Sequence, residues 1–360
     1  MIMVASPQAS MRAAIVVARG LLRLDDVPIP GCRPDTMIVK VEACAICGSD
    51  VRIYRHGDAR AKYPVIIGHE IAGIVADVGR EVVGYSVGDR VCVAPGIGCG
   101  ECKYCKGGHS NVCINPYPPI GYALDGGFAQ YMEVPPNVIR LGYVNGIPEG
   151  VSFEHASISE VIACCLNGLE NCPVHDGDVV LIFGAGPAGC ILSILAKTAG
   201  ARRVLMTQRS LPRLEAASRR LGTVDRVIPS LQEDLEAAVM EETEGRGADV
   251  VYVCAPSAES QKCAISLADG RGRILFFGGL PKDRCRIVVN SNLIHYKELL
   301  ITGASSSLAR HNKDALRLIA SGRIDAGRLI THTLPLEAIL EGMRLVEEKA
   351  AIKVVVRPSA

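Results

Sequence analysis

A thiol, an imidazole and a carboxylate in the first part of the chain are residue types that bind a catalytic metal ion. Cys47 lies in the stretch CGSD, and His69 and Glu70 end the stretch GHE. Catalytic zinc takes three protein ligands of these types and leaves a fourth position for water or substrate. Ser49 and Asp50 are placed to support such ligands. These residues are only half of such a site, and a third firm ligand must come from elsewhere in the chain. The alternative is a buried structural cysteine near a core histidine, which is the commoner role of a lone residue of either type.

Four further cysteines form a second candidate metal site. They are separated by two, two and seven residues, and they are Cys99, Cys102, Cys105 and Cys113. Four thiolates at such spacing close a tetrahedral zinc shell, which is the structural kind of site. The alternatives are an iron–sulfur cluster, whose ferredoxin spacings differ, or two disulfides, which a cytosolic chain disfavours. The spacing therefore predicts a structural zinc.

A glycine-rich turn in the middle of the chain predicts a dinucleotide site. The apolar run VVLIF leads directly into Gly184, Gly186 and Gly189, and an apolar-faced helical pattern follows. Between a strand and a helix, GxGxxG allows a tight turn and close approach of a pyrophosphate to the helix N-terminus. Cys254 ends a later strand pattern, where we expect it to face the nicotinamide.

The residues after the next strand indicate which dinucleotide binds. NAD sites carry an acidic residue there for the ribose 2′-hydroxyl. This chain instead offers Gln208, Arg209 and Ser210, with Arg213 one turn later. Arginine suits a 2′-phosphate through paired hydrogen bonds, so NADP is favoured over NAD. The alternative is that both arginines are solvated surface charges.

The strand and helix patterns predict an α/β chain of two interleaved domains. Short β-rich runs with Pro and Gly turns fill the first 150 or so residues and indicate a barrel-like antiparallel module. From residue 178 strands and helices alternate, which predicts a doubly wound parallel sheet. The last run, IKVVV, is a strand that we expect to pair back into the first module.

Composition excludes several classes of function. The 360 residues carry a net charge of +1, which argues against a nucleic-acid partner. Apolar runs fall short of the roughly 20 residues that span a bilayer, and the start of the sequence lacks the pattern of a targeting segment. We therefore expect a cytoplasmic protein with no membrane partner, in which the scattered cysteines are small buried residues.

Together these motifs resemble the zinc-containing medium-chain dehydrogenases, nearest the polyol (sorbitol or xylitol), threonine and sugar-alcohol dehydrogenase branch. The resemblance covers nearly the whole chain. It implies a GroES-like, β-rich catalytic domain over residues 1–160, completed by 301–360. It also implies a Rossmann domain over 161–300, with a cleft between the two. Members of the family form homodimers or homotetramers, and the resemblance extends that expectation to this chain.

The resemblance also assigns roles to single residues. Cys47 and His69 correspond to ligands of a catalytic zinc, Glu70 to a ligand or a close neighbour of one, and Glu160 to the third ligand of the polyol branch. Ser49 matches the hydroxyl that takes the substrate proton. Gln208, Arg209 and Arg213 look like the variant found in NADP-using members, and the four-cysteine lobe would hold a structural zinc. Arg52 departs from the family pattern, because a histidine often relays the proton there and arginine cannot act as a base.

The function implied is hydride transfer between a secondary alcohol, a polyol or sugar alcohol, and NADP or NAD. Two alternatives stay open. One is an NADPH-dependent aldehyde or ketone reductase on the same scaffold, and the other is a non-catalytic protein that binds zinc and nucleotide.

Overall fold

The structure is a computed structural model that describes residues 9–359. Residues 1–8, which are part of the start that lacks the pattern of a targeting segment, lie outside the described residues. The chain divides into two compact units with interleaved segments. The first unit runs to Glu160 and takes up residues 308–322 and the stretch from Ile330 onward, while the second unit holds Val161–Ser307 and Arg323–Leu329.

The first unit is built on a largely antiparallel sheet with the strand order β15-β16-β3-β5-β6-β8, and β7 also pairs with β3. A smaller sheet has the order β2-β1-β4. The strands of the two sheets are β1 (Ser10–Ala18), β2 (Leu21–Pro28), β3 (Met37–Ile46), β4 (Val65–Ile66), β5 (Glu70–Val78), β6 (Arg90–Val93), β7 (Tyr131–Val134), β8 (Val144–Gly146), β15 (Ile330–Pro335) and β16 (Lys353–Arg357).

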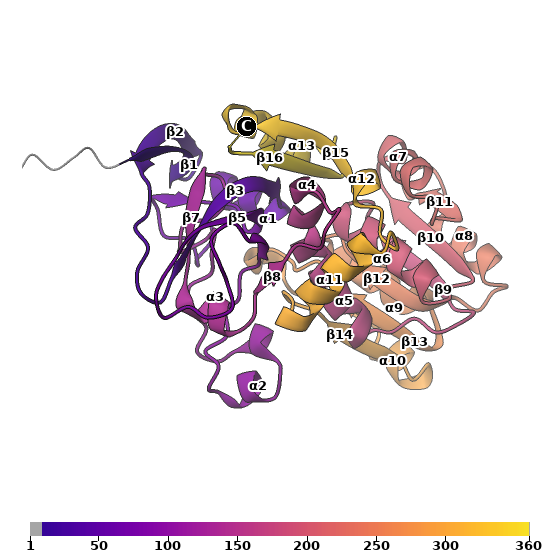
Figure 1. Ribbon diagram of the computed structural model, residues 1–360. Coiled ribbons are helices and arrows are strands. Elements are labelled where there is room, and N and C mark those ends of the chain that lie inside the picture. Colours follow the sequence, from indigo (N-terminus) through magenta and orange to yellow (C-terminus); the bar gives the residue numbers. More distant parts are fainter. Residues whose placement is uncertain (1–8, 360) are drawn as a thin grey trace, which may run out of the picture. The chain divides into compact units, whose positions relative to one another are not determined.

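The last strand of the chain completes this sheet. β16 pairs antiparallel with β3, so that Val354 lies opposite Ile46, and pairs parallel with β15. Figure 1 draws β3 in indigo and β16 in yellow because they come from opposite ends of the chain. Most of β3 and all of β16 except Arg357 is buried, as expected for apolar strands inside a sheet. This pairing brings the end of the chain to the residues just before Cys47.

Short helices connect the strands of the first unit. They are α1 (Gly48–His56), α2 (Lys103–Lys106), the 3₁₀ turn Ser110–Val112, α3 (Pro136–Arg140), α4 (Phe153–Ser157), α11 (Ala309–Ala320), the 3₁₀ turn Leu336–Ala338 and α13 (Ile339–Glu347). The first module is therefore less purely β than the strand pattern alone predicts. α1 begins directly after β3, with Cys47 as its N-cap residue.

The second unit contains a parallel sheet with the strand order β11-β10-β9-β12-β13-β14. Its strands are β9 (Val179–Phe183), β10 (Arg203–Gln208), β11 (Arg226–Pro229), β12 (Ala248–Val253), β13 (Ala268–Phe276) and β14 (Leu300–Gly303). This order is that of the doubly wound dinucleotide-binding fold, with the first strand of the unit, β9, at the centre. β14 belongs to this sheet, although the family resemblance placed residue 301 at the start of the returning segment.

Helices alternate with the strands of the second unit from β9 to β14. The helices of this unit are α5 (Ser159–Asn171), α6 (Pro187–Thr198), α7 (Leu211–Leu221), α8 (Leu235–Glu242), α9 (Ala258–Leu267), the 3₁₀ turn Lys282–Arg284, α10 (Ser291–Tyr296) and α12 (Ala326–Leu329). In the sequence, α5 and α12 lie before and after the alternating series. β9 is buried along its full length, which explains why its sequence is uniformly apolar. α6 starts immediately after the glycine-rich turn that leaves β9.

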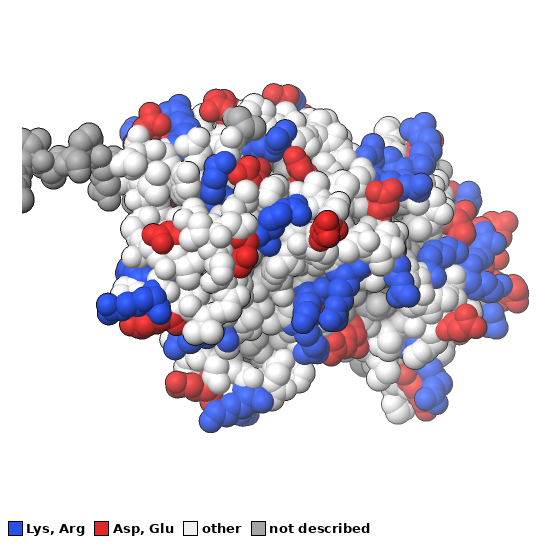
Figure 2. All heavy atoms as spheres, in the orientation of Figure 1, with Lys and Arg blue, Asp and Glu red and all other residues white. Residues whose placement is uncertain are grey.

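Charge is mixed on the molecular surface. On the face drawn in Figure 2, basic and acidic side chains are interspersed, as the net charge of +1 leads one to expect. Among the described helices, the apolar stretches are too short to cross a membrane.

Candidate active site

Three potential metal ligands converge in the first unit where α1 and β5 begin. Cys47 is the N-cap of α1, His69 precedes β5, and Glu70 is the first residue of that strand. One ligand atom of each residue lies within 4.8 Å of those of the other two. His69 and Glu70 are buried, whereas Cys47 is partly exposed. Two motifs separated by about twenty residues thus form one cluster because β3 and β5 are paired neighbours.

Asp50 fastens the two halves of this cluster together. Its Oδ2 accepts a 2.8 Å hydrogen bond from the Cys47 backbone N–H, and its Oδ1 accepts one of 3.3 Å from Gly68 N–H. The same Oδ1 lies 3.3 Å from His69 Nδ1, which leaves Nε2 on the other side of the ring for a metal ion. Burial lowers the pKa of His69, but the Asp50 carboxylate, Tyr122 and Cys47 together outweigh burial, and the pKa is raised.

Two further side chains lie next to His69. Ser49 is near its Nε2 atom, and the ring of Tyr122 is near its imidazole ring. Ser49 Oγ is 3.5 Å from His69 Nε2. The Tyr122 ring centroid is 5.6 Å from that of His69, with a tilt of 45° between the rings. A hydroxyl next to the ligand nitrogen can exchange a proton with an oxygen that binds there.

Lys353 is a member of the cluster that the sequence patterns did not reveal. Its ammonium donates to Glu70 Oε1 and, at 3.0 Å, to the carbonyl oxygen of Ile46. Both charged side chains are almost completely buried, with exposed fractions of 2% and 0%. A lysine inside an apolar strand pattern indicates a buried ion pair, because a charge buried there needs a partner. The identity of that partner depends on how β16 pairs with β3.

Glu70 therefore has two different oxygens. Oε1 is held by Lys353, whereas Oε2 is buried and has no hydrogen-bond partner among the described residues. Burial raises the pKa of Glu70, and the Lys353 ammonium opposes that rise. Buried carboxylates are normally paired or bind a cation. Oε2 is therefore a candidate metal ligand.

Glu160 is the second acid that the resemblance assigned to the metal. It is buried and lies in the first turn of α5. Its charge helps to raise the pKa of both Glu70 and Lys353. Among the described residues, however, the compact group of ligand atoms contains Cys47, His69 and Glu70 and does not include Glu160. In this structure Glu160 is a close neighbour of the cluster.

The donor set fits zinc. One thiol sulfur, one imidazole nitrogen and carboxylate oxygens are the ligands that catalytic zinc takes. The orphaned Oε2 of Glu70 and the Asp50-oriented ring of His69 are the features expected around such an ion, because outer carboxylates fix the orientation of ligating histidines.

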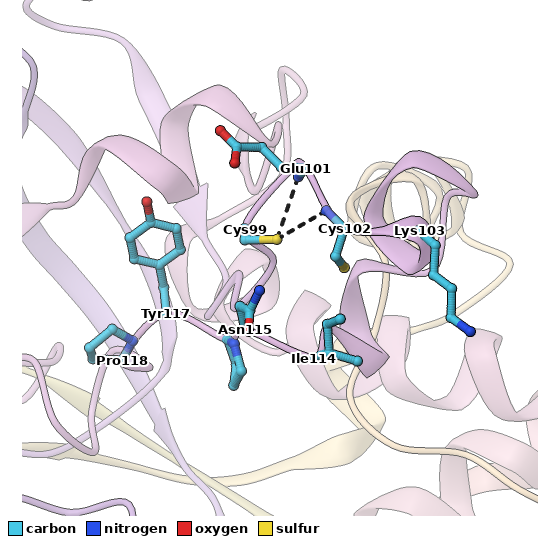
Figure 3. Close-up of a pocket in the computed structure, with 9 residues that line it drawn as sticks. Cys99, Glu101, Cys102, Lys103, Ile114, Asn115, Tyr117 and Pro118 are labelled. Carbon is cyan, nitrogen blue, oxygen red and sulfur yellow. Dashed lines mark hydrogen bonds between the residues drawn. The ribbon is translucent and has the colours of Figure 1, made fainter.

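The four cysteines of the second candidate site also come together. Cys99 and Cys105 sulfurs are 3.9 Å apart and those of Cys102 and Cys113 are 3.8 Å apart, and all four are free thiols. Figure 3 shows the backbone N–H groups of Glu101 and Cys102 directed at the Cys99 sulfur, at 3.4 and 3.3 Å. Such N–H donors stabilise thiolate, and hydrogen bonds from the backbone N–H groups of Cys105 and Ile114 are the main reason why the pKa of Cys102 is lowered to about 6.

A pocket of about 670 Å³ opens beside these thiols. It is lined by Cys99, Cys102 and the segment 114–118, and Figure 3 shows Ile114, Asn115 and Tyr117 around it. The sulfur spacing suits a tetrahedral ion with bonds of about 2.3 Å, for which ligand sulfurs lie about 3.8 Å apart. The lobe thus has the geometry of a closed structural zinc site.

The glycine-rich turn of the second unit requires glycine at two positions, one for its backbone conformation and one for lack of space. Gly184 has φ of +110°, a conformation that favours glycine, and a Cβ on Gly189 would lie 1.9 Å from the Gly184 carbonyl oxygen. Gly186 is the N-cap of α6 and has no capping side chain. The free N–H groups of that helix end suit a phosphate.

Gln208 and Arg213 hold this turn from the side of β10 and α7. Gln208 Oε1 accepts from the Ala185 N–H at 2.8 Å, and Arg213 Nε donates to the Ala185 carbonyl at 3.1 Å. Gln208 Nε2 and Arg213 Nη1 are buried and have no partner among the described residues. Arg213 is thus not a solvated surface charge, and burial lowers its pKa.

Arg209, Ser210 and Cys254 occupy strand ends. Arg209 and Ser210 are exposed directly after β10, where the 2′ position of an adenine ribose is expected. Cys254 follows β12, and its N–H donates to the Phe183 carbonyl at 3.0 Å. The structure therefore brings Gln208 and Arg213 to the turn itself and leaves Arg209 and Ser210 at its rim.

Two family models match the chain. Residues 33–142 match the "alcohol dehydrogenase GroES-like domain" and residues 187–321 match "zinc-binding dehydrogenase". The first match contains Cys47, His69, Glu70 and the four-cysteine lobe, and the second begins within the glycine-rich turn.

Curated relatives match along nearly their full length. A sorbitol dehydrogenase from Bacillus subtilis is 31% identical over 97% of this chain and 98% of its own. An L-threonine 3-dehydrogenase from Caldanaerobacter subterraneus is 33% identical over 92% and 93%. A probable D-xylulose reductase A from Aspergillus terreus is 28% identical over 93% and 94%.

Solved structures share the whole fold. A zinc-binding dehydrogenase candidate from Sinorhizobium meliloti 1021, bound to NADP, superposes with a TM-score of 0.89 and is 31% identical over 98% of this chain and 100% of its own. An Escherichia coli CFT073 alcohol dehydrogenase in complex with NADH gives 0.88 at 29% identity, over 97% and 99%. The chain therefore belongs to the polyol branch of the zinc-containing medium-chain dehydrogenases, and it is an NAD(P)-dependent oxidoreductase that acts on alcohols.

Proposed function

We propose that this enzyme transfers hydride between a secondary alcohol group of a polyhydroxylated substrate and NADP. The observation that carries the proposal is the convergence of Cys47, His69 and Glu70 with a hydroxyl, Ser49 Oγ, 3.5 Å from His69 Nε2. The names of the relatives, sorbitol dehydrogenase and D-xylulose reductase among them, support a polyol as substrate.

The chain's own residues supply the binding and the proton transfer. When bound, zinc supplies a Lewis acid for the substrate oxygen and the nicotinamide supplies the hydride acceptor. Ser49 Oγ accepts the proton of the substrate hydroxyl and releases its own proton in turn. Cys47 and His69 hold the metal, while Asp50 fixes the ring of His69. Arg52 pairs with Asp58 at 3.0 Å and cannot take up a proton, so the proton leaves by another route.

Either carboxylate can complete the metal shell. Glu70 has a buried oxygen without a hydrogen-bond partner in the compact group of ligand atoms. Glu160 lies close enough for its charge to raise the pKa of Glu70. We propose that Cys47, His69 and one of these two acids hold a catalytic zinc, and that the four-cysteine lobe holds a structural one. Metal analysis of the purified protein is then expected to give two zinc ions per chain, and one ion after substitution of Cys47.

The proposed preference for NADP is based on the residues at the end of β10. They include no acidic residue, and Arg209 is exposed next to Ser210 and within one turn of Arg213. A guanidinium binds a 2′-phosphate, whereas an acid would repel it. Structural neighbours exist with NADP and with NADH, so the solved complexes do not decide between the two cofactors.

Initial velocities on a panel of polyols, sugars, simple secondary alcohols and threonine, each with NADP⁺ and with NAD⁺, test the proposal. Turnover of a polyol with a clear preference for NADP⁺ is the expected result. A preference for NAD⁺ would remove the phosphate-site part of the proposal and leave the chemistry intact. Absence of turnover in both directions, including ketone reduction with NADPH, would favour a binding protein.

We also propose that the enzyme self-associates through the edge strand β14. Its backbone pairs with β13 on one side, and Leu300 on the strand is 64% exposed. Tyr296 and Val288 nearby in the sequence are 78% and 87% exposed. Large exposed apolar residues beside an open sheet edge are typical of a surface that a second strand covers. Light scattering of the parent and of a Leu300→Lys variant tests this, and a monomeric parent would contradict it.

A further inference from the structure

Arg60 lies over an aromatic ring that contacts the metal-binding histidine. Its guanidinium carbon is 4.4 Å from the centroid of the Tyr122 ring, and that centroid is 5.6 Å from the centroid of His69. The guanidinium is therefore at most about 10 Å from the imidazole ring. Tyr122 and His69 are 8% and 5% exposed, whereas the Arg60 side chain is 56% exposed. Arg60 thus presents an accessible cation beside a buried metal cluster.

The position of this cation is fixed by Asp58. The Arg60 backbone N–H donates to Asp58 Oδ1 at 3.0 Å, its Nε donates to Oδ1 at 2.9 Å, and its Nη2 donates to Oδ2 at 3.0 Å. The loop is in turn tied to Tyr122, whose carbonyl accepts a 3.0 Å bond from the Lys62 N–H. Asp58 accepts from two of the five N–H groups of the guanidinium and Tyr122 is a further side-chain hydrogen-bond partner, which leaves up to two N–H groups for a ligand.

The positive charge is not cancelled at this place. Arg52 Nη2 also donates to Asp58 Oδ2, at 3.0 Å. Among the described residues, Asp58 is the carboxylate that pairs with either guanidinium, so two cations share one anion. Hydrogen bonds from Arg60 hold the pKa of Asp58 well below its usual range, so Asp58 stays charged at neutral pH. The group of Arg52, Asp58 and Arg60 therefore carries one net positive charge.

We propose that Arg60 binds an oxyanion of the substrate, so that the enzyme prefers a hydroxy acid or a phosphorylated polyol to the matching neutral sugar alcohol. The inference rests on the proposed function, because it places the reacting hydroxyl at the Cys47–His69 cluster. A fixed guanidinium with free N–H groups binds carboxylate or phosphate through paired hydrogen bonds. The guanidinium is at most about 10 Å from the imidazole ring, a distance that a carbon chain of a few atoms can span between the anion and the reacting hydroxyl.

The test compares matched neutral and anionic substrates on the zinc-loaded, full-length enzyme. The pairs are sorbitol with gluconate, threitol with threonate, and sorbitol with sorbitol 6-phosphate, and each is assayed with NADP⁺ and NAD⁺. We expect kcat/KM to be at least about tenfold higher for an anionic member, since charge-assisted hydrogen bonds contribute roughly that factor or more. A preference confined to the carboxylates or to the phosphate identifies which oxyanion the site takes.

Variants of Arg60 separate binding from folding. Arg60→Gln is expected to lower kcat/KM for the anionic substrates roughly 10- to 100-fold, mainly through KM, with a much smaller loss for the neutral ones. Arg60→Lys keeps the charge but not the paired geometry, and an intermediate loss is expected. Arg55→Gln is the matched control, because Arg55 lies over Tyr54 at 5.0 Å and pairs with Glu347 at the surface. It is expected to behave as the parent does.

Equilibrium binding distinguishes the anion site at Arg60 from the proposed enzymatic function. Calorimetry of gluconate, threonate, sorbitol 6-phosphate and sorbitol with the parent and Arg60→Gln reports the anion contact whether or not turnover occurs. Binding of an anion that Arg60→Gln weakens, without turnover of any alcohol, would refute the proposed function and leave the anion site standing. Equal kcat/KM and equal affinity for neutral and anionic substrates, or equal losses for both in Arg60→Gln, would overturn the anion site.

Discussion

The buried ion pair of Lys353 and Glu70 predicts that loss of Lys353 lowers the stability of the folded protein. Replacing Lys353 by Met removes the ammonium and leaves the Glu70 carboxylate, which is 0% exposed, without its charge partner. Removal of one member of a buried ion pair costs about 3–5 kcal/mol. For a domain of 150–250 residues each kcal/mol lowers Tm by about 2–4 °C, so a fall of roughly 6–20 °C is expected in the metal-free protein.

The size of this loss should depend on pH in a defined direction. Burial already raises the pKa of Glu70, and removal of Lys353 raises it further. A carboxyl whose pKa in the folded protein exceeds that in the unfolded chain favours the folded state at low pH, and this contribution is lost as pH rises through the folded pKa. The Lys353→Met variant is therefore expected to differ most from the parent near pH 8 and least near pH 5.

Thermal unfolding followed by circular dichroism, at one scan rate and after removal of metal, measures these changes. The control is the double variant Lys353→Met with Glu70→Gln, which replaces the pair by two uncharged groups and is expected to regain much of the lost Tm. A Lys353→Met protein within about 2 °C of the parent at pH 8, or a double variant no more stable than the single one, would refute the reasoning.

Four further outcomes are expected. Cys47→Ala abolishes turnover and removes one zinc ion per chain while dinucleotide binding, followed by fluorescence titration, persists; full activity would contradict a catalytic zinc there. Cys102→Ser removes the other zinc ion and lowers Tm, as metal analysis and calorimetry would show, because metal binding and folding of such a lobe are coupled. Ser49→Ala lowers kcat about 100-fold or more near neutral pH, and a pH–rate profile unchanged from the parent would exclude Ser49 as proton acceptor. Arg209→Ala raises KM for NADP⁺ roughly 10- to 100-fold and leaves KM for NAD⁺ nearly unchanged; equal effects on both would remove the 2′-phosphate contact.

Local patterns were sufficient to predict the chemistry and the class of fold. CGSD, GHE, the four spaced cysteines and GAGPAG each lie within a short stretch, and their residue types restrict what they can bind. The alternation of apolar strands and helices after residue 178 likewise predicted the parallel sheet, since period and order are properties of the sequence itself. The family comparisons confirmed the zinc-containing dehydrogenase and both fold types.

The tertiary structure decided which distant residues complete the site. Lys353 reaches Glu70 only because β16 pairs with β3, and Arg60 reaches the His69 surroundings only through Tyr122. Arg213, which the sequence analysis assigned to a 2′-phosphate, is held against the glycine-rich turn. Such contacts join residues far apart in the chain, and strand register and loop packing set them. Sequence by itself therefore determined which groups could do the chemistry, while the fold determined which charges surround them.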